Sequence, residues 1–312
     1  MDLFSTCLFC SENCRVVRVC VIYNPAAKGQ KAERFRRLLD TISTEATLKQ
    51  TAAPRDARRL AAQAISEGFD TLIAAGGDGT LNEVLNGMGD VPDGFAKVRL
   101  GILPLGTVNV FARELGIPLK PAAAWPVLQR GNEKRIDLAV VENGAGGETE
   151  RTYFAQLAGA GLDSRAIELV DWPLKKKIGP LAYVVAGLKA MREPHPQLVI
   201  SDGTRTVKGH LVLVGNGRLY GGTFRVFPKA DFCDGKLDVC IFPHVNWPTL
   251  LRCGFSLLLR RKLPEAKVIR LHTASFSFIG KSSTRFEVDG ELAGKLPARF
   301  SVQPLALRVL VP

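Results

Sequence analysis

Over residues 16–130 the spacing of apolar positions alternates between that of strands and that of helices. Residues 16–23 (VVRVCVIY) form an apolar, β-branched run typical of a buried strand, and Asn24-Pro25 breaks it. The next segment repeats apolar residues at the spacing of one helix face, at Phe35, Leu38, Leu39 and Ile42. The alternation continues with a helix over 57–65, a strand over 71–75, a helix over 81–88 and a strand over 100–105. Alternating strands and helices predict a doubly wound, mostly parallel α/β domain.

Beyond about Ile136 short segments with strict apolar and polar alternation replace this pattern, as in Arg285 to Val288. Turn sequences separate these segments, namely Gly215-Asn216-Gly217, Gly221-Gly222, Asp234-Gly235 and Asp289-Gly290. Helical spacing returns at 181–191 and 250–259. We therefore expect a second domain rich in antiparallel strands. The predicted domains span 15–138 and 139–312, and residues 1–14 are predicted to be a disordered extension.

The length of the chain, its apolar runs and its net charge exclude several classes of protein. The 312 residues suit two domains, and no apolar run approaches the roughly 20 residues that span a bilayer. The N-terminus lacks the basic head and apolar stretch of a secretory signal, so we expect a cytoplasmic protein. The net charge of +12 favours anionic partners, but no nucleic-acid-binding motif is present and we expect no nucleic-acid partner.

Two basic clusters stand beside apolar residues, at Lys175–Lys177 and at Arg260–Lys262. Basic and apolar residues side by side suit peripheral contact with an anionic membrane surface. The same clusters could equally be solvated helix ends. We expect peripheral membrane association and leave the second interpretation open.

The seven cysteines do not form a recognised framework. An odd number argues against a secreted disulfide scaffold. Cys7, Cys10 and Cys14 could bind a metal through their thiolates, but a complete four-ligand set is missing. A loose extension before Arg15 is the simpler interpretation.

The sequence strand–GGDGT–helix at 71–88 is the most informative chemical signal. Glycines directly after a parallel strand let a ligand approach the backbone, and the following helix directs free N–H groups and a positive dipole at the same place. This predicts a phosphate site. Asp78 would repel phosphates unless a metal or a hydroxyl group lies between them, which favours a kinase, although Asp-Gly is also a common turn. Thr80 and Glu83 have the spacing of a capping box, with Thr80 as the N-cap.

Two further loops follow predicted strands. Gly106 and Thr107 end the strand at 100–105, and Thr107 could donate to a phosphate or cap the next helix. Asn24 follows the first strand and could contact a nucleotide. Each loop alone is also an ordinary turn.

Carboxylates gather at two places in the second predicted domain. Asp231, Asp234 and Asp238 lie within one turn region, where hard oxygen ligands suit Mg²⁺ or Ca²⁺, although a solvated turn has the same composition. Asp289 and Glu291 flank a second turn and could provide a general base for a hydroxyl nucleophile. Because phosphoryl transfer needs positioning more than a strong base, Asp289 could orient the hydroxyl as much as deprotonate it.

Taken in order, these segments resemble the diacylglycerol kinase catalytic-domain family in its bacterial lipid-kinase branch, which is related to sphingosine kinases and NAD kinases. The matching segments are Asn24-Pro25, GGDGTLNEVLNG (76–87), PLGTVNVFAREL (104–115), GNGRLYGGTFRVFPKADFCDGKLDV (215–239) and EVDGE (287–291). GGDGT alone also occurs in NAD kinases and, more loosely, in phosphofructokinases. The resemblance covers nearly the whole chain from about Arg15.

The resemblance implies an α/β domain like that of NAD kinases and phosphofructokinases, an antiparallel β-sandwich domain, and an active-site cleft between them. Asp289 and Asp78 would be catalytic, with Asp289 accepting the proton of the lipid hydroxyl. ATP would bind at Asn24, Thr51, Gly76, Gly77, Asp78, Gly79, Thr80, Leu81, Asn82, Gly106, Thr107 and Glu291. A structural Mg²⁺ would be held by Asp234 and the backbone carbonyls of Asp231 and Lys236, with Asp163 joining that acidic network.

One departure from the family pattern is visible after Asn24-Pro25. Family members often have a small residue and then glycine, whereas Ala27-Lys28-Gly29 delays the glycine here. Lys28 could then contact a phosphate.

The resulting prediction is an ATP- and Mg²⁺-dependent lipid kinase that phosphorylates a membrane lipid such as diacylglycerol. An NAD kinase is the first alternative, but the second Asn-Glu block expected of it is not evident. A catalytically silent lipid- or nucleotide-binding regulator is the second, although both Asp78 and Asp289 are present. The sequence leaves the particular lipid undecided, and it leaves a homodimer open.

Overall fold

The computed structural model describes residues 17–25, 30–144, 149–171, 181–260, 263–264, 268–280 and 283–312. The cysteines of the N-terminal extension, Lys28 and the Lys175–Lys177 cluster lie outside these ranges, as do Arg261 and Lys262. Predictions that concern them therefore remain predictions.

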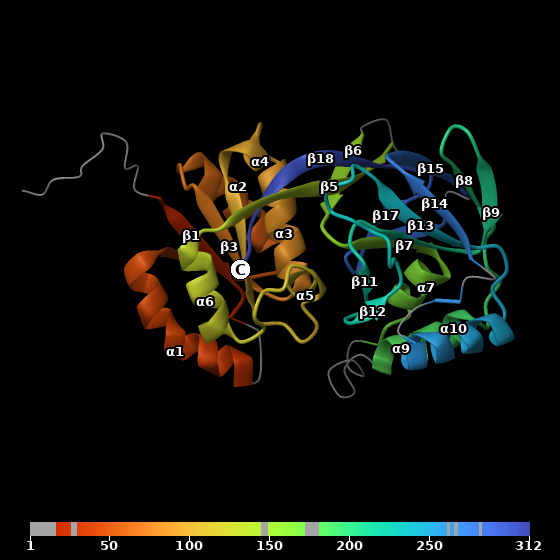
Figure 1. Cartoon of the computed structure of the whole chain (residues 1–312), viewed down its shortest axis with the longest axis horizontal. Helices are drawn as coiled ribbons and strands as arrows, with labels where there is room; N and C mark the ends of the chain where they lie inside the picture. Colours follow the sequence, from red (N-terminus) through yellow and green to blue (C-terminus); the bar gives the residue numbers. More distant parts are fainter. Residues whose placement is uncertain are drawn as a thin grey trace, which may run out of the picture.

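The first part of the chain forms a parallel sheet with helices on both faces (Figure 1). Its parallel strands run in the order β2-β1-β3-β4, and they are β1 (Val19–Tyr23), β2 (Thr47–Gln50), β3 (Thr71–Gly76) and β4 (Arg99–Pro104). The helices are α1 (Gln30–Glu45), α2 (Asp56–Ser66), α3 (Asp78–Gly89), α4 (Gly94–Lys97), α5 (Val110–Glu114) and α6 (Pro121–Arg130). Helix α2 packs against α3, and α1 packs against α6. The predicted doubly wound α/β domain is confirmed.

Two long strands carry this sheet into the second part of the chain. They are β5 (Glu133–Asn143) and β18 (Ala298–Leu310), which pair with each other in antiparallel fashion, while β18 also pairs in parallel with β4. Figure 1 shows both strands running between the two lobes. The sheet is completed by β6 (Glu150–Phe154), β8 (Leu198–Ser201), β9 (Thr206–Gly209) and β15 (Ser275–Ile279). The predicted boundary at 138/139 falls inside β5.

A second, antiparallel sheet packs against the far end of the first and forms the predicted β-sandwich. Its order is β14-β13-β10-β7-β16-β17. The strands are β7 (Leu157–Gly161), β10 (Leu211–Gly215), β13 (Leu237–Phe242), β14 (Ile269–Thr273), β16 (Arg285–Val288) and β17 (Glu291–Lys295). Between the sheets lies a core rich in phenylalanine, in which the Phe300 ring contacts Phe154, Phe276, Phe278 and Phe286.

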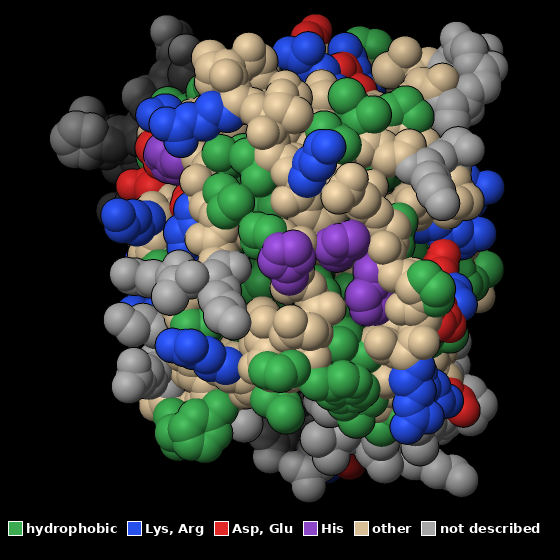
Figure 2. All heavy atoms as spheres, turned by 90° about the vertical axis from the view of Figure 1, so that its right-hand side faces the viewer, with side chains coloured by type: hydrophobic (Ala, Val, Ile, Leu, Met, Phe, Trp, Pro, Cys, Tyr) green, Lys and Arg blue, Asp and Glu red, His purple; other side chains and the backbone are tan. Residues whose placement is uncertain are grey.

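Among the residues that the structure describes, three helices and a short ribbon cover the outer face of the second sheet. These are α7 (Leu162–Glu168), α9 (Leu181–Ala190) and α10 (Trp247–Arg260), with the ribbon β11 (Leu219–Tyr220) and β12 (Phe224–Arg225). Seen from the end formed by β8, β9 and α10, hydrophobic side chains gather at the lower edge, where α10 lies (Figure 2). Among the described residues, no helix is both long and apolar enough to cross a membrane.

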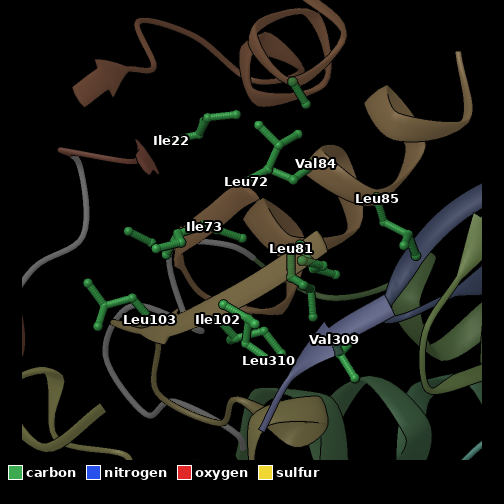
Figure 3. Close-up of a cluster of buried hydrophobic side chains, with 14 of the residues drawn as sticks. Ile22, Leu72, Ile73, Leu81, Val84, Leu85, Ile102, Leu103, Val309 and Leu310 are labelled. Atoms are coloured by element: carbon green, nitrogen blue, oxygen red, sulfur yellow. The ribbon is translucent and has the colours of Figure 1, made fainter. Parts of the chain in front are cut away.

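The core of the first domain explains why the sequences of its strands are continuous apolar runs. All six residues of β3 are buried because helices cover both faces of a parallel sheet. Side chains from β1, β3, β4, α3 and β18 meet there, including Ile22, Leu72 and Val309 (Figure 3). Packing of this density holds the carboxyl ends of the strands in fixed positions.

Candidate active site

Five predicted nucleotide contacts lie at one edge of the first sheet. In register, Tyr23 of β1 pairs with Gln50 of β2 and with Ala75 of β3, and Gly76 pairs with Pro104 of β4. The residues that follow these strand ends are Asn24, Thr51, Gly77 and the Gly106-Thr107 turn. The structure therefore brings the three predicted loops together at the carboxyl ends of parallel strands, where ligands bind in open α/β sheets.

The two glycine loops touch each other. A Cβ atom built on Gly106 would lie 2.6 Å from the Cα of Gly77, and one built on Gly76 would lie 2.3 Å from Oγ1 of Thr80. Larger residues therefore do not fit at these positions. Thr107 is exposed at this edge, whereas the Leu81 side chain is buried in the hydrophobic core, so Leu81 can offer a ligand only its backbone.

The predicted capping box is wrong. Helix α3 begins at Asp78 with Gly77 as its N-cap, and no side chain caps it. Thr80 lies inside the first turn because the glycine turn after β3 is shorter than predicted. The Glu83 carboxylate instead accepts hydrogen bonds from the backbone N–H of Arg55 (2.9 Å) and Ala57 (3.0 Å), at the start of α2. The first N–H groups of α3 thus have no side-chain cap.

Asp78 joins the two glycine loops. Its Oδ1 accepts a hydrogen bond from the backbone N–H of Val110 (2.8 Å), the first residue of α5. Burial raises the pKa of Asp78, and the nearby Asp289 carboxylate raises this pKa further. Asp78 and Asp289 are therefore close enough to interact, although they come from different domains.

Asp289 occupies a tight turn between β16 and β17. Its φ of 48° and the φ of 88° at Gly290 are both positive, as in the two-residue hairpin turns that favour Asp-Gly. The turn directs the carboxylate at consecutive backbone N–H groups. Oδ2 accepts from Ala155 (2.8 Å), and Oδ1 accepts from Gln156 (3.0 Å) and Leu157 (3.1 Å).

The fourth donor to Asp289 comes from the first domain. Nδ2 of Asn82, on α3, lies 3.1 Å from Oδ2 of Asp289. Burial raises the pKa of Asp289, while these four donors act in the opposite direction. Glu291 also reaches across, since a Cβ atom built on Gly79 would lie 2.7 Å from its Oε1. The second domain thus brings Asp289 and Glu291 to the start of α3.

A further carboxylate joins the domains beside this site. Glu114, at the end of α5, accepts hydrogen bonds from the Arg218 side chain (2.8 Å), the Leu219 backbone N–H (2.8 Å) and the Gln156 side chain (3.1 Å). Because Gln156 also donates its backbone N–H to Asp289, Glu114 supports the segment that holds the Asp289 carboxylate.

Asp163 does not join the loop predicted to bind metal. It lies at the start of α7, accepts a short hydrogen bond from the Tyr220 hydroxyl and faces the carboxyl group of Glu287. Glu287 is fully buried. The Oε1 atom of Glu287 and the Oδ2 atom of Asp163 have no other hydrogen-bond partner. Burial raises the pKa of Glu287 well above its ordinary value, and Asp163 adds to this shift. The repulsion between two buried negative charges favours a proton on one of the two groups.

The predicted metal residues lie in a loop that is closed by its own hydrogen bonds. Oδ1 of Asp231 accepts from the backbone N–H of Cys233 (3.0 Å), and Oδ1 of Asp234 accepts from that of Lys236 (2.9 Å). The His272 ring lies between Asp234 (3.2 Å) and Asp238 (3.4 Å). Within the part of the chain that the structure describes, no three His, Cys, Asp or Glu side chains gather as a metal site.

This loop nevertheless fits a hard cation in type, because Asp234 and backbone carbonyls are oxygen ligands. The loop is also firmly placed. Asp137, which is fully buried, accepts the backbone N–H of Gly235 (2.6 Å) and of Leu305 (2.8 Å). A Mg²⁺ ion held by Asp231, Asp234 and Lys236 stays a prediction.

Sequence reasoning missed Asn86 and Glu287 as parts of this site. The side chain of Asn86 donates to the carbonyl of Tyr153 (2.9 Å) and accepts its N–H (2.8 Å), which attaches α3 to β6. The signal was present, since Asn82 and Asn86 lie four residues apart on an otherwise apolar helix face. Glu287 and Asp289 are likewise two residues apart around a strand end.

The comparisons with known proteins agree with this architecture. Residues 18–141 match the diacylglycerol kinase catalytic domain, and residues 156–311 match the YegS C-terminal NAD kinase beta sandwich-like domain. A protein of Staphylococcus saprophyticus named diacylglycerol kinase is 31% identical over 308 residues, covering 95% of each chain. A Pseudomonas aeruginosa protein named "Probable lipid kinase YegS-like" is 36% identical over 279 residues, covering 86% of this chain and 85% of its own length.

Solved structures share the fold. A Bacillus anthracis structure described as a diacylglycerol kinase superposes with a TM-score of 0.70 at 20% identity, covering 95% of this chain and 97% of that one. Yeast NADH kinase complexed with NADH gives a TM-score of 0.54 at 12% identity, covering 96% and 84%. The sequence relatives and the two family matches together settle the family. The chain belongs to the diacylglycerol kinase catalytic-domain family of lipid kinases.

Proposed function

We propose that this chain transfers the γ-phosphoryl group of Mg-ATP to the hydroxyl group of a membrane lipid, and that diacylglycerol is the lipid. One observation supports the proposal above the others. The carboxylate of Asp289, which belongs to the second domain, lies 3.1 Å from the amide of Asn82 on α3, the helix that begins within GGDGT. A proton acceptor and a phosphate-binding turn therefore face one another between two domains.

In this proposal the phosphates lie against the turn from Gly76 to Gly79. The turn carries no side chain except that of Asp78, and the uncapped N–H groups of α3 add the positive end of the helix dipole. Asn24, Thr51 and Thr107 would contact the rest of the nucleotide from the neighbouring strand ends. The family's use of ATP is consistent with this arrangement.

Asp289 would accept the proton of the lipid hydroxyl. Its four donors occupy roughly all the lone-pair positions of the carboxylate, so a hydroxyl must replace one of them. Three donors are backbone groups, and the fourth is the Asn82 side-chain amide, which also donates to the Tyr153 carbonyl (3.2 Å). The raised pKa of Asp289 makes its carboxylate a stronger proton acceptor than an ordinary aspartate.

The loop of Asp231, Asp234 and Lys236 would have a structural task. A bound Mg²⁺ would supply positive charge to the loop that packs beneath α5, where the Phe232 ring contacts Phe111 at 5.7 Å. Asp137 holds the backbone of this loop in place.

Labelled ATP offered with a panel of lipids and with NAD tests the proposal. The panel contains diacylglycerol, monoacylglycerol, a sphingoid base and a polyprenol. We expect label on diacylglycerol above all other acceptors. Label on another lipid would keep the lipid kinase and reject diacylglycerol, label on NAD and on no lipid would reject the lipid kinase, and no label at all would favour the non-catalytic alternative.

A further inference from the structure

The outer face of the second sheet contains a cavity of about 500 Å³ between α7, α9, α10 and β10. This volume is within the range of roughly 300–1,000 Å³ found for small-molecule sites. Its lining includes Met191, Leu211, Leu213 and Leu250, together with the Asp163 and Tyr220 side chains, which hydrogen-bond to each other. The cavity is therefore apolar apart from this polar pair.

Two glycines keep this space open. Gly187 is in α9 and Gly254 is in α10, and both line the cavity. A Cβ atom built on either would meet nothing within 4 Å, and neither has a positive φ. Neither backbone conformation nor packing therefore requires glycine, although glycine destabilises a helix interior. A bound molecule would occupy the free space above these two glycines.

Helix α10 is apolar on its exposed side as well as on its buried side. Its large exposed apolar residues recur every fourth position, at Trp247 (43% exposed), Leu251 (68%), Phe255 (66%) and Leu259 (67%). Leu188 of α9 is 46% exposed beside them. We call these five residues the apolar stripe. A contiguous exposed stripe of large apolar side chains marks a membrane or partner surface.

The cavity opens through this stripe. Trp247, Leu251, Phe255 and Leu188 belong both to the stripe and to the cavity lining. An apolar molecule lying against the stripe would thus reach the interior without crossing a polar rim.

The charge of the two helices indicates what lies against the stripe. The 10 residues of α9 and the 14 residues of α10 include no Asp or Glu, whereas Lys189 and Arg252 are exposed. Figure 2 shows hydrophobic side chains at this lower edge with Lys or Arg on either side. Apolar residues flanked by cations fit an anionic bilayer surface.

The polar pair in the cavity lining leads toward Asp289. On the outer face of the sheet, Leu213 pairs with Gly159 and Gly159 pairs with Glu287, so the cavity floor is two strand spacings, about 10 Å, from Glu287. The backbone N–H of Gly290 donates to Glu287 (2.8 Å), directly after Asp289. A chain held in the cavity would therefore have its head near the proposed acceptor.

We propose that the apolar stripe lies on an anionic bilayer and that the cavity behind it takes one acyl chain of the lipid substrate. The membrane half of this inference stands on the stripe and the charges beside it, and the acyl-chain half rests on the proposed lipid kinase function.

Vesicle sedimentation tests the membrane half without any kinase reaction. The vesicles contain equal parts of phosphatidylglycerol and phosphatidylcholine, or phosphatidylcholine alone. The variant L251E/F255E should lose binding to the anionic vesicles by about tenfold or more, because it places two charges in the apolar layer. Ile279, which is 52% exposed on β15, provides the control I279E, which should bind as the wild type does. Wild-type binding by L251E/F255E would overturn the membrane half.

A fluorescent fatty acid, cis-parinaric acid, tests the cavity. G187L/G254L should fill the open space and weaken binding of this probe by about tenfold or more, while vesicle binding and the melting temperature stay close to wild type. The control A123L adds apolar bulk to an exposed position of α6 and should bind the probe as the wild type does. Unchanged probe binding by G187L/G254L would overturn the cavity half.

The kinase assay then tests whether the cavity binds the acyl chain of the lipid substrate. For G187L/G254L we expect the KM of a long-chain diacylglycerol to rise about tenfold, and the KM of dibutyryl glycerol to stay within about twofold. An equal rise for both lipids would contradict an acyl-chain site. If the wild type phosphorylates neither lipid, the proposed function fails, while the sedimentation and probe experiments still decide the membrane face and the cavity.

Discussion

Asp289 and the Asp163–Glu287 pair are two acidic regions separated by only one residue of β16, yet their surroundings are opposite. Asp289 accepts four hydrogen bonds, three from consecutive backbone N–H groups and one from Asn82. Oε1 of Glu287 and Oδ2 of Asp163 face each other with no other donor. Burial raises the pKa at both places, but only at Asp289 do several donors oppose that rise.

The difference shows that donors, rather than residue type, decide what a buried carboxyl group can do. A carboxylate held by N–H groups is stabilised as an anion and can receive a proton from substrate. Two facing carboxyl oxygens with no donor between them favour a shared proton, which would hold β16 to α7. Substitutions at the two places should therefore have different consequences.

The largest effect is expected for Asp289→Asn. The amide keeps the shape of the side chain but cannot accept the proton of a hydroxyl group, so kcat should fall by about 10²–10⁴-fold with little change in ATP affinity. Steady-state kinetics with the best lipid of the panel measures this. Asp202→Asn, in another strand-joining turn where the carboxylate accepts backbone N–H groups, is the matched control. Near-normal turnover of Asp289→Asn would remove Asp289 from the acceptor role.

An intermediate effect is expected for Asn82→Ala, which removes the one side-chain donor to Asp289. Loss of a charge-assisted hydrogen bond of about 1.5–3 kcal/mol should lower kcat/KM by about 10- to 100-fold. Since the lost donor stabilised the anion, the pKa of Asp289 should rise further. The acid limb of the profile of kcat/KM against pH should then move to higher pH. An acid limb that stays in place would show that Asn82 does not stabilise the carboxylate.

The smallest effect on activity, and a distinct one on stability, is expected for Glu287→Gln. Folded wild type keeps a proton on this group that the unfolded chain loses above about pH 4.3, so its stability falls as pH rises from there toward the raised pKa. The Gln amide can donate to Asp163 at any pH. The melting temperature of Glu287→Gln should thus match wild type at about pH 4 and exceed it by a few degrees at about pH 8.

Thermal unfolding at both pH values, with activity measured alongside, checks this prediction. Asp163→Asn/Glu287→Gln, which removes both ionisable groups, should show the same flat dependence on pH. Parallel curves for wild type and Glu287→Gln would mean that the pair shares no proton, and the contrast with Asp289 would disappear.

The sequence by itself determined the architecture and the glycine loops. Strand and helix periods, together with Gly76-Gly77 and Gly106 directly after apolar strands, are local signals, and parallel strands bring their carboxyl ends to one edge. It also predicted Asp289 at a turn, because Asp-Gly tolerates the two positive φ angles that a tight hairpin requires.

Only the tertiary structure decided which groups meet. Glu83 caps α2 instead of α3, and Asp163 pairs with Glu287 instead of with the loop predicted to bind metal. In both cases the partners are distant in sequence, and the spacing of apolar residues carries no information about such contacts. The cavity between α9 and α10 depends in the same way on how two helices lie over a sheet. Patterns along a chain specify elements and turns, whereas the donors around a carboxylate and the space between helices arise when separate elements pack together.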